Sequence, residues 1–331
     1  MERDIKQVID QLKVLGFGDG WEGFIVPLSK TLSDQDKAEI VIKTGDANQW
    51  TTFVLNLKKN AGELSFPSYK GTFIKVPDFE HKIINGIDSE ALEALMQRLD
   101  WRVDFVKLEE KQEQTSKGVT DSIRDYHKAV ANLTMLGATD EGKLISDALK
   151  IRYLVSTPYD ERYISPELKE RCVNERIFFA GNAFAFTKDE ATNLLEGRAV
   201  LKNYFDKDGC KQKGWLKTLP GENSTGEKNI LFSGRQEFYP VYDLSSVIKT
   251  LPLAFKEKEE RAGFIKSLQK GDLLEINIPK AGKEEMYFME AWPQAKSIHL
   301  YDASMKSITR KEMLLDYVAP QRKKPSRGKH L

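Results

Sequence analysis

The spacing of apolar residues changes from helical to alternating within residues 186–232. Thr187 and Glu190 form a capping box, in which each side chain can accept a hydrogen bond from the backbone of the other residue, so a helix is predicted to begin there. Gly197 can take the left-handed conformation that ends this helix. Alternating positions then predict three strands, at residues 199–201, 215–216 and 229–232. The segment is therefore predicted to be a helix followed by a small antiparallel sheet.

The same order of elements recurs twice elsewhere in the chain. After a helical stripe at 264–268 and Gly271, alternating positions predict strands at 273–278, 286–289 and 297–301. A weaker copy near the N-terminus predicts strands at 39–42, 52–57 and 62–66. Such repetition indicates related supersecondary units, although helix–hairpin patterns also arise by chance in α+β chains.

Aromatic residues support a common register in these copies. Trp215 follows the turn residue Gly209 by the same number of positions as Phe288 follows Gly282. The interval from Phe53 to Phe66 also equals the interval from Phe288 to Tyr301. The sequence thus predicts that these aromatic residues occupy equivalent strand positions.

The remaining patterns complete an α+β fold with small antiparallel β units, each preceded by a helix, and a helical middle region. Apolar residues at helical spacing predict helices at 119–136 and 144–149, joined by a short turn at 137–139. The predicted domains are an N-terminal helix plus β-rich unit at 1–80, the helical middle region at 81–176, helix/three-strand units at 177–245 and 246–318, and a basic disordered tail at 319–331.

Composition narrows the class of protein. Lys and Arg total 51 against 50 for Asp and Glu, so the net charge of +1 creates no global field that would attract nucleic acid. The two cysteines, Cys172 and Cys210, show neither a disulfide framework nor zinc spacing, which fits a reducing compartment. The N-terminus is an amphipathic helix, and no apolar run approaches the roughly twenty residues of a membrane span. We therefore expect a cytoplasmic protein without a membrane partner.

Catalytic motifs are hard to find in this sequence. None of the four histidines pairs with another at metal-ligand spacing, and the glycine-rich stretch at 15–24 follows a helix rather than the strand a phosphate loop requires. Arg171 beside Cys172 could favour a thiolate, yet no partner histidine is near in sequence, which favours a buried structural cysteine. The sequence predicts no cofactor, no metal and no catalysis.

Basic residues interleaved with aromatic ones provide one candidate binding site. Lys211, Lys213 and Trp215 share a predicted strand, and Lys202 and Tyr204 precede them on its neighbour. A sheet surface of this composition can stack single-stranded bases. In the alternative interpretation Trp215 faces the core, and the lysines protect an edge strand from pairing with other chains.

The C-terminal tail is the second candidate. It lacks acidic residues and carries five cationic ones, Arg322, Lys323, Lys324, Arg327 and Lys329. Cationic side chains of this kind neutralise phosphates on a polyanion. A tail that merely keeps the protein soluble has the same composition, so both interpretations stand.

Much of the chain resembles a group of uncharacterised proteins carried on conjugative and mobile elements of gut Bacteroidetes. The matching segments are 186–191, 194–200, 207–209, 214–216, 242–244, 268–271, 290–296 and 301–306, with looser similarity at 15–18 and 96–101. The group has no assigned activity, so the resemblance implies a genetic context rather than a mechanism. Because such elements encode DNA-handling machinery, it favours nucleic-acid association by analogy.

These patterns together predict a non-catalytic binding or accessory protein of a mobile element that engages a protein partner or nucleic acid. The alternatives are a single-stranded nucleic-acid-binding protein using the basic aromatic sheet and the tail, and an enzyme of unrecognised class. A deep pocket lined by carboxylates, or by Cys172 and a histidine, would indicate an enzyme.

Overall fold

The computed structural model describes residues 2–33, 35–110, 117–181, 184–205, 208–219, 235–280, 283–315 and 317. Helices alternate with small antiparallel sheets, which confirms the α+β class. The first of two compact units contains the described residues of Met1–Gln11, Gly20–Gly181 and Pro220–Arg235, and the second those of Leu12–Asp19, Asn182–Leu219 and Gln236–Leu331. Within these ranges no helix is both long and apolar enough to cross a membrane.

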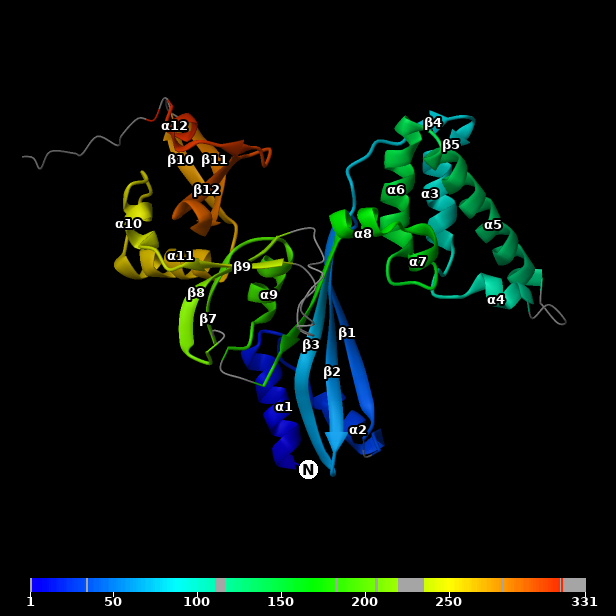
Figure 1. Cartoon of the computed structure of the whole chain (residues 1–331), viewed down its shortest axis with the longest axis horizontal. Helices are drawn as coiled ribbons and strands as arrows, with labels where there is room; N and C mark the ends of the chain where they lie inside the picture. Colours follow the sequence, from blue (N-terminus) through cyan, green and yellow to red (C-terminus); the bar gives the residue numbers. More distant parts are fainter. Residues whose placement is uncertain are drawn as a thin grey trace, which may run out of the picture. The chain divides into compact units, whose positions relative to one another are not determined.

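A four-stranded antiparallel sheet forms the N-terminal part of the first unit (Figure 1). Its strands, in sheet order, are β1 (Lys37–Gly45), β2 (Gln49–Asn60), β3 (Glu63–Lys75) and β6 (Val173–Phe179). Helices α1 (Glu2–Val14) and α2 (Glu22–Thr31) lie beside it. Tyr69 is buried in the sheet and stacks on Phe178, with ring centroids 5.1 Å apart. Asp4 accepts a 2.9 Å hydrogen bond from the Leu64 amide, so polar contacts also tie α1 to the sheet.

Strand β6 corrects the predicted domain boundary. The boundary between residues 176 and 177 falls inside this strand, and β6 pairs with β3, where Ile177 lies opposite Lys70. The sequence pattern correctly indicated a strand here but assigned it to the following unit. Pairing between segments so far apart along the chain leaves no local sequence signal.

The helical region has the elements β4 (Ile83–Ile84), β5 (Ile87–Asp88), α3 (Ser89–Arg98), α4 (Phe105–Glu110), α5 (Lys117–Gly137), α6 (Asp140–Leu154), α7 (Asp160–Tyr163) and α8 (Pro166–Cys172). Asp88, Thr139 and Ser165 cap three of these helices through their side-chain oxygens.

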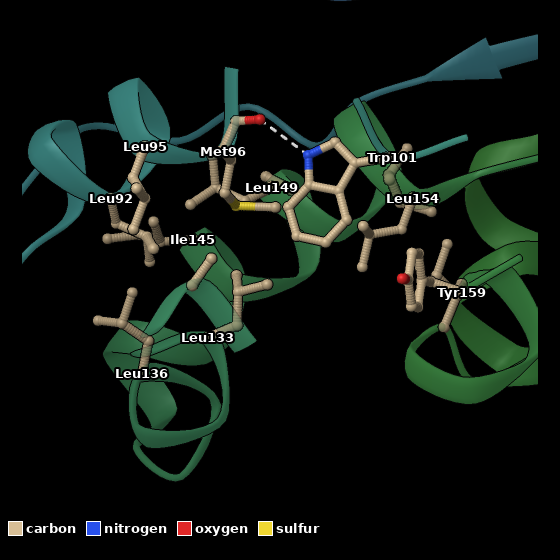
Figure 2. Packing of buried hydrophobic residues seen from close by; sticks show 14 of the residues in the cluster. Leu92, Leu95, Met96, Trp101, Leu133, Leu136, Ile145, Leu149, Leu154 and Tyr159 are labelled. Atoms are coloured by element: carbon tan, nitrogen blue, oxygen red, sulfur yellow. Dashed lines mark hydrogen bonds between the residues drawn. The ribbon is translucent and has the colours of Figure 1, made fainter. Parts of the chain in front are cut away.

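Apolar side chains from α3, α5 and α6 interdigitate in the core of this region, as Figure 2 shows. The Trp101 indole packs among them and donates a 2.8 Å hydrogen bond to the Met96 carbonyl. The same apolar cluster includes Trp50, Ile74 and Val76 of the N-terminal part. The helical region therefore shares a core with the sheet and is not the separate domain expected at 81–176.

The second unit contains two helix-and-sheet regions. Region A has α9 (Lys188–Leu195), β7 (Val200–Phe205), β8 (Lys211–Leu219) and β9 (Arg235–Pro240). Region B has α10 (Leu244–Lys249), α11 (Lys258–Lys270), β10 (Leu274–Lys280), β11 (Lys283–Trp292), the short helix η1 (Pro293–Ala295), β12 (Ser297–Asp302), β13 (Ser307–Ile308) and α12 (Arg310–Met313). The strand predicted at 229–232 lies outside the described residues, and β9 is the third strand of region A.

The start of α9 and the glycines that follow α9 and α11 were predicted correctly. The capping box of Thr187 and Glu190 opens α9. Gly197 and Gly271 follow α9 and α11 with φ of 82° and 90°, the left-handed conformation that glycine adopts without steric cost. A β-strand starts three residues after each glycine, which is the repeated order expected from the sequence.

The predicted aromatic register is wrong. Phe288 does lie opposite Tyr301, but Phe53 lies opposite Gly71, so the N-terminal sheet has a different register. Trp215 points into an apolar core, whereas Phe288 is half-buried and shares the outward side of its strand with Met286 and Trp292. Equal spacing after a turn therefore does not give equivalent orientation, because one residue more or less in a strand reverses its face.

Regions A and B are joined where their helices end. The Asn193 side chain donates hydrogen bonds of 2.9 Å to the Lys270 carbonyl and 2.8 Å to the Asp272 carboxylate. Arg198 donates from Nε to the Gly271 carbonyl at 2.8 Å. A Cβ atom on Gly271 would lie 2.9 Å from the carbonyl oxygen of Ala199, so this close approach also requires glycine.

Candidate binding surfaces

Two of the residues predicted to bind nucleic acid are already engaged within the protein. Lys202 donates hydrogen bonds of 2.7 Å to the Glu190 carboxylate and 2.9 Å to the Ala185 carbonyl, and its side chain is only 16% exposed. Trp215 is 1% exposed, and its ring stacks on Tyr242 at 5.6 Å. The predicted role of Trp215 in stacking bases is therefore wrong in this structure, because a buried indole offers no free face.

The other predicted strand residues remain accessible to different degrees. Lys211 and Lys213 are exposed on β8, and the Lys211 ammonium lies 5.5 Å from the centroid of the Phe184 ring. Tyr204 packs on Phe238 of β9 with ring centroids 4.6 Å apart. Because Tyr204 lies opposite Gln212, it occupies the other side of the sheet from Lys211 and Lys213, and what remains of the predicted site is two exposed lysines. The tail residues Arg322, Lys323, Lys324, Arg327 and Lys329 lie outside the described residues.

A different surface of region B combines aromatic and acidic side chains. One side of the sheet β10–β11–β12–β13 packs against α10, α11 and α12, through an apolar cluster that includes Ile276, Met289 and Leu300 (Figure 1). The opposite side carries the alternate strand residues Glu275, Asn277, Glu284, Met286, Phe288, Glu290, Trp292, Ser297, His299, Tyr301 and Ser307. We call this side the acidic aromatic face.

Three rings form a continuous stack across the acidic aromatic face. Trp292 lies 5.1 Å from His299 at an interplanar angle of 25°, and His299 lies 4.5 Å from Tyr301. Trp292 is 39% exposed and Met286 is 38% exposed, which is unusually open for side chains of this size on central strand β11. The stack therefore presents aromatic edges and a flexible thioether to solvent.

Hydrogen bonds hold this stack in one arrangement. The Tyr301 hydroxyl donates to the Glu290 carboxylate at 2.6 Å and lies 3.0 Å from His299 Nδ1. Because the hydroxyl has one proton, His299 Nδ1 must be the donor in the second contact, and Nε2 lies 2.7 Å from Ser307 Oγ. Burial and then the hydrogen bond to Glu290 raise the pKa of Tyr301 well above its usual range. The network fixes the rings before any ligand arrives.

The order serine, imidazole and carboxylate occurs in nucleophilic relays, so its geometry matters here. His299 Nδ1 is 3.6 Å from the Glu290 carboxylate, and the Tyr301 hydroxyl lies within hydrogen-bonding distance of both. Glu290 lies opposite His299, and Tyr301 lies opposite Ser307, so strand register alone brings these groups together. The arrangement orients the side chains of a sheet surface.

The acidic aromatic face has a negative charge pattern. Its outward strand positions include the exposed residues Glu275 and Glu284 and the buried Glu290, and none of those described is a lysine or arginine. Lys296 and Lys306 lie in the connections at the two ends of β12. A negative surface attracts cationic ligands and repels phosphate groups.

A polar network in the helical region serves packing instead. The Glu93 carboxylate accepts from His81 Nε2 and from the Tyr153 hydroxyl, both at 3.0 Å, and pairs with Arg152. Arg152 also reaches the Asn48 side chain at 2.7 Å. Burial, followed by the bond to Glu93, raises the pKa of Tyr153 to about 12. The network ties α3 and α6 to the turn before β2.

The structure also bears on the reactivity of Cys172 and on metal binding. Cys172 is buried, and burial raises the pKa of its thiol against the smaller opposing effect of Arg171, so the neighbouring arginine does not produce a thiolate. Among the described residues, no group of three or more His, Cys, Asp or Glu side chains is arranged to hold a metal ion.

The acidic aromatic face was not predicted from the sequence. Residues 286–289 read Met-Tyr-Phe-Met, so both sides of the strand carry large apolar residues and alternation does not distinguish them. The available signal was the recurrence of aromatic residues at alternate positions of the next strand, His299 and Tyr301, beside Trp292.

Comparison of the chain with models of protein families, with curated proteins and with solved structures gives no match.

Proposed function

We propose that this chain is a non-catalytic binding protein, an accessory protein of a mobile element, that engages a protein partner through the acidic aromatic face. The observation that carries the proposal is a partly exposed, hydrogen-bonded ring stack beside Met286 and three glutamates. Tryptophan, tyrosine and methionine are enriched in protein interfaces. The genetic context comes from the sequence resemblance alone.

Charge favours a protein partner over nucleic acid for this face. Phosphates would approach the exposed carboxylates of Glu275 and Glu284, which costs electrostatic free energy. A partner segment that carries lysine or arginine beside apolar residues would gain contacts with both the carboxylates and the rings.

Single-stranded nucleic-acid binding is the second candidate. Exposed Lys211 and Lys213, which share one side of β8, favour it, whereas Tyr204 and Phe238 lie on the other side of the sheet. That site lacks Trp215 as a stacking surface, so its affinity would depend mainly on charge.

A peptide-display selection tests the proposed function. Peptides selected on the wild-type protein should be rich in lysine, arginine and apolar residues, and they should lose at least tenfold in affinity on a Trp292→Ala variant. Phe238→Ala, which removes another exposed aromatic side chain, is the matched control and should leave binding unchanged. Selected peptides that bind the Trp292→Ala variant normally, or a selection that yields no specific peptide even on a chain that ends at Tyr317, would refute the proposal.

A further inference from the structure

We propose that the basic C-terminal segment of this chain, residues 318–331, docks on the chain's own acidic aromatic face. The inference rests on the proposed function in that it uses the same surface, and it names an internal occupant for it. Three observations carry the proposal: where the segment begins, how far it reaches and how its charge compares with that of the face.

The segment begins at the edge of the correct sheet. Tyr317 forms an antiparallel β-bridge with Lys280, the last residue of edge strand β10. A chain that continues in this antiparallel sense runs beside β10 from Lys280 towards Leu274. It therefore travels along the sheet from the end that carries Glu284 towards the end that carries Trp292.

The segment is long enough to cover the face. Residues 318–331 span up to about 46 Å when extended. The ten residues of β11 cover about 33 Å. The segment can thus reach Glu275, Glu290 and Trp292 without any change in the described residues.

The charges are complementary. The segment has five cationic side chains and no aspartate or glutamate, whereas the face has two exposed glutamates, Glu275 and Glu284. A tether of this length gives an effective concentration on the order of millimolar, so even weak binding occupies the face. The segment would then compete with an external basic partner, and a polyanion that captures the segment would free the face.

A chain that ends at Tyr317 keeps every described residue and supplies the test. A fluorescent peptide of residues 318–331 is titrated into this truncated chain and into the full chain, with fluorescence anisotropy as the readout. We expect saturable binding to the truncated chain that weakens steeply with salt. Binding to the full chain should be at least tenfold weaker, since its own segment occupies the face.

Variants locate the peptide on the protein. In the truncated chain, Glu275→Gln with Glu284→Gln should reduce the affinity for the peptide about tenfold. Both glutamates are exposed, so these changes leave the core intact. Glu39→Gln with Glu63→Gln, exposed on the N-terminal sheet, is the matched control and should change nothing.

Three outcomes would overturn the inference: no binding of the peptide at low salt, equal binding to both chains, or equal affinity for the face variant and the wild type. Each is distinct from failure of the proposed function. Display peptides that need Trp292 but bind the full and truncated chains equally would support the proposed function and refute the docked segment. If the tail peptide binds but no external peptide is selected, the docked segment would be supported and the proposed function refuted.

Discussion

Regions A and B of the second unit share an order of elements but use their aromatic residues differently. In region A, Trp215 is buried against Tyr242, and the accessible strand residues at the far end of β8 are lysines. In region B, Trp292 lies on the open side of the sheet among glutamates. Similar local signals therefore produce a packed surface in one region and a partly exposed surface in the other, and the side of the strand decides which.

Replacing the two tryptophans should give the largest contrast. Trp215→Ala removes a fully buried ring and should lower the free energy of unfolding by about 3–5 kcal/mol. Trp292→Ala should cost less than about 1 kcal/mol, because much of its ring is already in water. Urea denaturation of the second unit measures both.

Trp215→Phe is the control for that comparison. It keeps most of the apolar contact and removes an indole N–H that is buried without a hydrogen-bond partner among the described residues. Trp215→Phe should therefore lower the free energy of unfolding by much less than Trp215→Ala does. Equal losses for Trp215→Ala and Trp292→Ala would contradict the assigned orientations.

Gly271→Ala should have the next largest effect. The new Cβ would meet the Ala199 carbonyl at 2.9 Å and the Asn193 Cβ at 3.0 Å, at a residue with φ of 90°. Strain and displacement together should cost about 3 kcal/mol. Gly209→Ala, at φ of 74° with open space around it, should cost only about 1 kcal/mol. Thermal denaturation distinguishes the two, and similar melting temperatures would refute the tight junction.

Alkaline pH should reveal the partly buried phenol of Tyr301 in region B. Burial and the bond to Glu290 raise the pKa of folded Tyr301 above the 10.0 of an ordinary tyrosine. The unfolded chain then loses this proton first, so the contribution of Tyr301 to stability is complete below about pH 10 and is lost as the pH rises through the folded pKa. Tyr301→Phe should flatten the decline of unfolding free energy above pH 10. An unchanged slope would show that Tyr301 is not shielded.

The smallest effect is expected for nucleic acid in region A. Changing Lys211 and Lys213 to glutamine should weaken binding of single-stranded DNA a few-fold and reduce the slope of log affinity against log salt by about 1.4. Lys202→Gln should leave that slope unchanged, because Glu190 already neutralises the ammonium. Electrophoretic mobility shifts at several salt concentrations measure these effects. If Lys202→Gln reduces the slope as the Lys211 and Lys213 changes do, the ion pair between Lys202 and Glu190 must open.

Features that depend on residues close together in the sequence were predicted correctly. The capping box at Thr187 and the left-handed glycine at Gly197 depend on residues within one helical turn, and both were predicted correctly. The pairing of β6 with β3 depends on residues far apart in the chain, so the boundary placed at 176 was wrong.

The candidate site was harder to predict than the fold. Trp215 stands among lysines in sequence, which suggested a surface, but its side of the strand faces the apolar cluster with Ala199 and Leu268. The acidic aromatic face depends on register across three strands, and that register brings Glu290, His299 and Tyr301 together. The spacing of apolar residues reveals neither which side of a strand faces the core nor the register between strands when both sides of the strand are apolar.

The position of β6 has a consequence for biosynthesis. The ribosome completes β3 at Lys75 but reaches its neighbour β6 only at Val173. At translation rates of about 5–20 residues per second, the edge of β3 waits roughly 5–20 s for its partner. During this interval the nascent chain exposes an unpaired edge that can pair with other chains. Rapid folding of α3, α5 and α6 therefore adds little to this period, because translation sets its length.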